Sequence, residues 1–176
     1  MRFFLYPFIL LAGLGLSWSL ASHICALLGW PIPGGHWAWT LHLGIFVVWL
    51  PTVLVGKRMT GNTRRSDFWK IVLAGCPDWA RYALYGLFAY TVLNFIIGIS
   101  ARPGQEDSAA GIRIFSGHWM LFYGAAMATL YSAVARPELL LPRTCFLGHR
   151  VSLLDENCPV CGTLMAEETT ESVPKD

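Results

Sequence analysis

Four side chains that can bind a metal stand close together near the end of the chain, in the stretch CFLGHRVSLLDENCPVCG at 145–162. Cys145 and His149 have three residues between them, whereas Cys158 and Cys161 have two and are followed by a glycine. Zinc prefers four tetrahedral sulfur and nitrogen ligands, and closed sites of this kind combine cysteine with histidine. The spacing therefore predicts a zinc site formed by these four side chains.

This stretch resembles the zinc-ribbon-like class of small metal-binding modules. The CPVCG knuckle carries the resemblance, and the Cys-x3-His pair before it is a less standard partner. Four protein ligands leave no open coordination position, so the resemblance implies a structural site rather than a catalytic one. So short a segment has too little apolar core to fold without its metal. The alternative is that these are ordinary residues of an unstructured tail.

Three histidines of the membrane part are predicted to share one depth. His23, His42 and His118 each lie four or five residues from the outer end of a predicted helix, which is about 6–8 Å below the outer surface at the rise of an α-helix. His36 lies just above them, and Asn94 lies in the same half. Ionisable residues within spans usually face the bundle interior.

One interpretation of these histidines is a haem or copper site near the outer face, and another is a polar site for proton chemistry or a polar ligand. Histidine is a common ligand of transition metals, and His42 and His118 are the first choice for a pair on a haem iron. The alternative is that each histidine anchors its helix near the headgroups or bonds to a neighbouring helix. All three lie at one depth, which argues against an electron path across the membrane.

The segments that would position the metal ligands and the outer histidines are strongly apolar. Of the 176 residues 55% are hydrophobic and 14% are charged, against about 25% charged in soluble domains. Four stretches reach the roughly 20 apolar residues that a transmembrane helix needs, namely 3–28, 37–55, 79–100 and 114–135. We therefore predict an all-α integral membrane protein, a four-transmembrane-helix bundle, rather than an oily soluble bundle.

The rest of the organisation follows from this bundle. The membrane domain covers 1–136, the zinc-knuckle tail 137–165, and an acidic, disordered end 166–176. The pattern at 66–75 predicts a short helix in the membrane interface. Small residues at steps of four in the first span, Gly13, Ser17 and Ala21, would allow close packing against another helix; the alternative is that glycine and alanine are simply common in membrane helices.

The distribution of charge predicts the orientation. The first loop, 29–36, carries no charge. The second loop and its flanks carry five basic residues, Lys57, Arg58, Arg64, Arg65 and Lys70. Because positive charge beside the spans marks the cytoplasmic side, we expect a multi-pass protein of the inner (cytoplasmic) membrane with both termini in the cytoplasm. Cysteines there stay reduced, which favours metal over disulfides.

The sequence contains no nucleophile–base pair, phosphate loop or paired buried carboxylates. It therefore favours a scaffold, accessory subunit or assembly factor over an enzyme, with the lipid bilayer and a protein partner or a second copy as its contacts. A membrane redox protein using the outer histidines is the alternative, and a small transporter or channel subunit is the third interpretation. Few basic residues flank the knuckle, so nucleic acid is not an expected partner.

Overall fold

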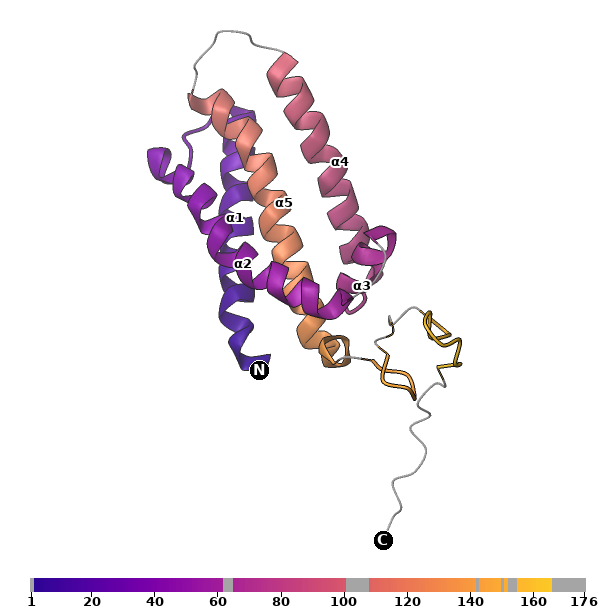
Figure 1. Ribbon diagram of the computed structural model, residues 1–176. Coiled ribbons are helices and arrows are strands. Elements are labelled where there is room, and N and C mark those ends of the chain that lie inside the picture. The colour runs from indigo at the N-terminus through magenta and orange to yellow at the C-terminus, as the bar shows by residue number, and fades with distance from the viewer. Residues whose placement is uncertain are drawn as a thin grey trace.

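The fold is helical from the N-terminus to the base of the tail. The computed structural model describes residues 2–61, 65–100, 108–141, 143–149, 151 and 155–165. In chain order its elements are η1 (Arg2–Phe4), α1 (Tyr6–Leu28), η2 (Gly35–Trp39), α2 (Thr40–Thr60), η3 (Arg65–Asp67), α3 (Phe68–Val72), α4 (Asp78–Ser100), α5 (Ser108–Ala135) and η4 (Pro137–Leu140) (Figure 1). The predicted disordered end, 166–176, lies outside the described residues.

Three helices in the described part of the chain are long and apolar enough to cross a membrane. They are Tyr6–Leu28, Gly35–Thr60 and Asp78–Ser100, and they correspond to the first three predicted spans. The prediction of a helical membrane protein is thereby supported by three helices, and the count of four stays a prediction. The fourth predicted span, 114–135, falls within α5, which has 28 residues and is not among these three helices.

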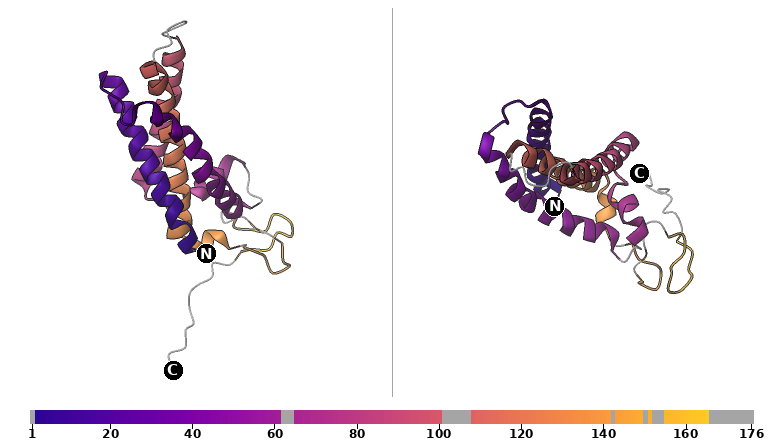
Figure 2. Two further views of the ribbon diagram at one scale, coloured as in Figure 1. Left: turned by 90° about the vertical axis from the view of Figure 1, so that its left-hand side faces the viewer. Right: turned by 90° about the horizontal axis from the view of Figure 1, so that it is seen from above.

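The helix α5 lies at the centre of the bundle. This helix contacts α1, α2 and α4 and lies between them in both views (Figures 1 and 2). Its polar side chains Ser116, Thr129 and Ser132 are buried. A helix that presents most of its surface to protein does not need an apolar side chain at every position.

The turn between α1 and α2 is closed by glycines and a tryptophan. Gly29, at the end of α1, and Gly34, before η2, have φ values of 68° and 79°, a left-handed region that glycine enters without strain. The Trp18 indole donates from Nε1 to the Pro33 carbonyl at 3.0 Å. This short link lets α1 and α2 lie against each other as antiparallel neighbours.

The segment between α2 and α4 folds back onto the bundle. Here α3 covers Phe68–Val72 and is shorter than the predicted helix at 66–75. Ile71, Val72 and Leu73 are buried. The Arg81 guanidinium donates to the Leu73 and Ala74 carbonyls, both at 3.0 Å, and so joins the start of α4 to the segment that follows α3.

All four long helices have one end near the N-terminus of the chain. We call this the basal end: it contains the start of α1, the end of α2, the start of α4 and the end of α5 (Figure 1). The connector η4 leaves α5 there and is held against α2, because Arg58 Nε donates to the Leu140 carbonyl at 3.1 Å and Leu139 is buried. The tail therefore begins at a fixed place on the basal end.

Candidate metal centre

Two tight turns build the predicted zinc segment. In the first, the Gly148 N–H donates to the Cys145 carbonyl at 2.8 Å, and in the second the Gly162 N–H donates to the Cys158 carbonyl at 2.8 Å. Both glycines have positive φ, 79° and 71°, which lets the chain reverse immediately beside a ligand. An isolated antiparallel bridge joins Asn157 to Leu164 around the second turn.

The turns bring all four predicted ligands together. The ligand atoms of Cys145, His149, Cys158 and Cys161 lie within 4.8 Å of one another. Cys145 Sγ is 3.4 Å from His149 Nδ1 and 3.6 Å from Cys161 Sγ, and Cys158 Sγ is 3.8 Å from His149 Nδ1. The two halves of the motif, separated by eight residues, thus converge on one point.

The geometry and chemistry of this group fit a tetrahedral metal. With Zn–S bonds of about 2.3 Å and Zn–N bonds of about 2.0–2.1 Å, neighbouring ligand atoms in a tetrahedron lie about 3.5–3.8 Å apart, and the three distances above, 3.4, 3.6 and 3.8 Å, are close to this range. Three sulfurs and one imidazole nitrogen are also a donor set that selects zinc over hard cations. The group can therefore hold a structural metal such as zinc.

The surroundings of the thiols change their acidity in opposite directions. A hydrogen bond from the Thr163 hydroxyl, 3.1 Å from Cys161 Sγ, is the main cause that lowers the pKa of Cys161 to about 6, with the Thr163 N–H and His149 adding to it. Burial raises the pKa of Cys158. Metal binding takes thiolates and releases their protons, so the tail is partly prepared for metal at neutral pH.

Each outer histidine has its own surroundings. His23 is buried, whereas His36 and His42 are exposed and His118 is half-buried. Nδ1 of His42 accepts a hydrogen bond from Trp119 Nε1 at 3.2 Å, and Nδ1 of His118 lies 3.2 Å from the Ile114 carbonyl. Within the described residues, the Cys–His group of the tail is the single cluster of three or more potential metal ligands. A haem pair at His42 and His118 stays a prediction.

The buried polar contacts of this outer half join three helices. His23 of α1 bonds through Nδ1 to Ser116 Oγ of α5 at 2.7 Å and through Nε2 to the Tyr90 hydroxyl of α4 at 2.5 Å. Asn94 Nδ2 donates to the Arg113 carbonyl at 3.0 Å and so joins α4 to α5. Polar side chains in membrane helices often form such bonds between helices, so these contacts hold α4 on the bundle.

Replacement of His23 by leucine is expected to lower the free energy of unfolding by about 0.6–1.7 kcal/mol, because hydrogen bonds between membrane helices are worth this much. Detergent-solubilised protein would be titrated with SDS and followed by circular dichroism. His36→Leu is the control, since His36 is exposed and its loss should change little. Equal midpoints for both variants would show that the His23 contacts do not stabilise the bundle.

Two partners of these residues were not predicted from the sequence. Thr163 influences the Cys161 thiol, and a hydroxyl beside a CPVCG knuckle is a local signal that could have been noticed. Tyr90 meets His23 across 67 positions of the chain, and nothing in the sequence pairs them. Comparison of the chain with known protein families, curated proteins and solved structures gives no match.

The class of protein is therefore defined by its own features. It is a helical protein with apolar helices that can cross a membrane, and it carries a potential metal-binding group in its tail.

Proposed function

We propose that this chain is a four-span membrane protein whose cytoplasmic tail is folded by one structural zinc, and that it serves as a scaffold, accessory subunit or assembly factor. The observation that carries the proposal is the convergence of Cys145, His149, Cys158 and Cys161 on one point. A site with four protein ligands has no position left for a substrate or an activated water. The metal would therefore shape the tail and perform no reaction.

The membrane placement is supported by the helices and by the charges at the basal end. Lys57 and Arg58 lie in the last turn of α2, and Arg136 follows α5. Because basic residues beside spans favour the cytoplasmic side, we place the basal end and both termini in the cytoplasm of a cell with an inner membrane. The central position of α5 supports its role as the fourth span.

The accessory role follows from what the bundle offers to other molecules. The outward faces of α1, α2 and α4 carry many exposed apolar side chains, and these suit lipid or a neighbouring membrane helix. A small bundle whose metal site has no open coordination position would act through such contacts with other molecules. We propose a protein partner or a second copy as the functional contact, in addition to the bilayer.

Metal analysis of the full chain tests this proposal. Detergent-purified protein should contain one zinc per chain and show no visible absorption band. Cys161→Ser should lose the zinc, because three ligands remain, whereas the control Cys25→Ser should keep it, since Cys25 lies in α1, apart from the group. A Soret band or stoichiometric copper that depends on His42 and His118 would contradict the proposal and support the redox alternative.

A further inference from the structure

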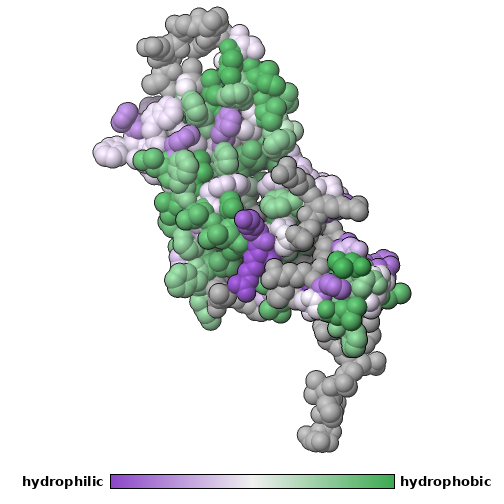
Figure 3. Space-filling view, in the orientation of Figure 1, coloured by the Kyte–Doolittle hydropathy of each residue, from purple (hydrophilic) through white to green (hydrophobic). Residues whose placement is uncertain are grey.

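The turns that carry the ligands also present large apolar side chains to the outside. Phe146 and Leu147 lie between Cys145 and His149, and they are 93% and 61% exposed. Val160, between the other two ligands, is 68% exposed, and Leu164 is 76% exposed. We call these four residues the apolar tip. Hydrophobic side chains gather on the tail in the space-filling view (Figure 3).

Within the described residues of the tail, the buried cluster consists of Cys145, Val151 and Cys158, with Cys161 and Met165 packed against it, and it does not include the apolar tip. Exposed apolar side chains that gather on one surface often mark a site that binds a protein or a membrane. The apolar tip is therefore a candidate contact surface.

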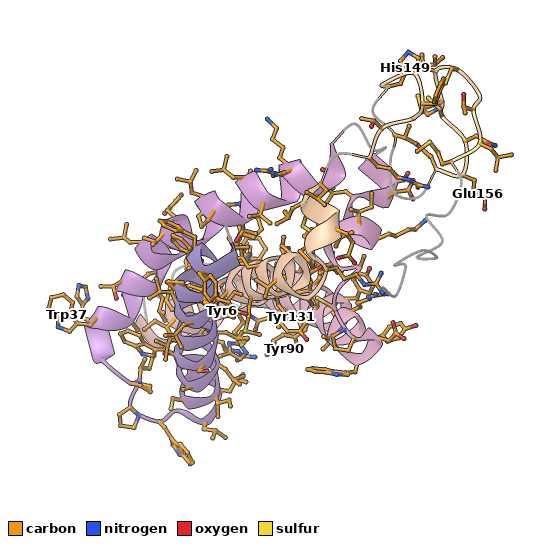
Figure 4. The ribbon with its side chains drawn as sticks, turned by 90° about the horizontal axis from the view of Figure 1, so that it is seen from below. Tyr6, Trp37, Tyr90, Tyr131, His149 and Glu156 are labelled. Carbon is orange, nitrogen blue, oxygen red and sulfur yellow. The ribbon has the colours of Figure 1, made fainter. Side chains whose placement is uncertain are left out.

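The position of the tail favours the membrane as that contact. The segment around His149 lies to the side of the helices, outside their outline, when the bundle is seen from above or from below (Figures 2 and 4). Seen from the side, it lies level with the basal end and does not extend far beneath it (Figure 1). For a bundle that spans the bilayer with its basal end in the cytoplasm, as proposed above, the neighbouring material at this place, beside α3, is the inner surface of the bilayer.

The attachment of the tail keeps that surface within reach. The connector η4 is fixed on α2 through Arg58 and buried Leu139, and only Leu141 to Thr144 separate it from Cys145. So short a tether gives the apolar tip a high effective concentration at the membrane surface.

We propose that the apolar tip inserts into the headgroup region of the cytoplasmic leaflet, so that the zinc-folded tail lies on the membrane surface. The inference rests on the proposed function, since it needs a bundle that spans the bilayer and a tail that is folded by metal. Aromatic and aliphatic side chains at the rim of a small folded unit are suited to this boundary, as in amphipathic helices that lie in the interface.

Photo-crosslinking of the full chain in vesicles tests the inference. Benzoylphenylalanine would replace Phe146 in protein reconstituted into phosphatidylethanolamine–phosphatidylglycerol vesicles. After illumination, mass spectrometry should find phospholipid attached at position 146. The matched control carries the probe at Glu156, an exposed polar position of the same tail, where the lipid adduct should be several-fold less abundant or absent.

The outcomes separate this inference from the proposed function. Zinc is measured on the same sample: protein with one zinc per chain and no lipid adduct at position 146 would overturn the inference alone. Crosslinked dimers at position 146 would overturn it as well, in favour of a second copy as the contact. A sample without zinc would contradict the proposed function, and the inference would fall with it. The same probe at Val160 should also crosslink to phospholipid, which would show that the contact is not limited to position 146.

Discussion

Cys158→Ser is expected to unfold the tail and to leave the helices intact. Cys158 is 2% exposed, and its thiol would be one of four ligands to a metal whose binding supplies about 10–16 kcal/mol to small zinc modules. The remaining buried cluster is too small to compensate. The effect should match that of replacing any of the other three ligands, because metal binding and folding of such a segment are one event.

Hydrogen exchange of the full chain in detergent measures this loss. The amides of Cys145, Gly148, Cys158 and Gly162 donate hydrogen bonds of 2.8–2.9 Å within the two turns, so they should be protected in the zinc-loaded protein. In Cys158→Ser these amides should exchange at the rate of an unfolded chain, while those of α1 and α5 keep their protection. Cys25→Ser is the matched control and should leave the tail amides protected. Tail amides that stay protected in Cys158→Ser would mean that the tail folds without metal.

The ligand group could be predicted because its information is local. Two pairs of ligands, each within a few residues, require only two tight turns, and the glycines that permit those turns stand next to the ligands in the sequence. The same holds for the apolar spans, since length and composition are properties of a continuous segment. That α5 would occupy the centre could not be read in this way, because its neighbours are set by packing between distant segments.

The outer histidines show which information the sequence lacks. The helical rise predicts how deep a residue lies, but the direction of its side chain depends on how each helix is rotated about its axis. His23 points inward, whereas His42 is exposed, although both were predicted at one depth. Side chains meet at a common site only when both their depth and their direction agree, and a single sequence predicts only the depth.

The small residues of the first span show the same limit. Gly13, Ser17 and Ala21 were the candidates for a close contact, yet Ser17 is exposed. The buried small residues are instead Ala12, Gly15, Ser19 and Ser22. Both sets have helical spacing, so periodicity alone could not choose between them. The Tyr123 ring of α5 packs against Gly15, which belongs to the buried set.

Tyr123 connects three helices through two glycines. It is 3% exposed, and its hydroxyl donates to the Leu41 carbonyl of α2 at 2.8 Å, so the ring cannot easily move away. A Cβ placed on Gly15 would lie 2.5 Å and 2.6 Å from two ring carbons, Cδ1 and Cζ. A Cβ on Gly44 of α2 would overlap the hydroxyl oxygen, with the nearest ring carbon at 3.6 Å. The ring excludes a side chain at Gly15, and the hydroxyl excludes one at Gly44.

Gly44→Ala is therefore expected to lower the free energy of unfolding by about 1–3 kcal/mol, the usual cost of overpacking a filled core. In a Tyr123→Phe background this cost should largely disappear, because the oxygen that clashes with the new methyl group is gone. Tyr123→Phe alone should cost about 1 kcal/mol for the lost hydrogen bond. Gly15→Ala should remain destabilising in both backgrounds, since phenylalanine keeps the ring carbons.

Unfolding of the six proteins by SDS, followed by circular dichroism, completes both double-mutant cycles. Gly86→Ala serves as the control for glycine substitution itself, because a Cβ there meets nothing within 4 Å and alanine favours a helix over glycine by about 1 kcal/mol. If Tyr123→Phe removes the cost of Gly44→Ala but not that of Gly15→Ala, the hydroxyl and the ring make separate contacts. Equal relief at both positions, or at neither, would contradict this assignment and place Tyr123 differently between the helices.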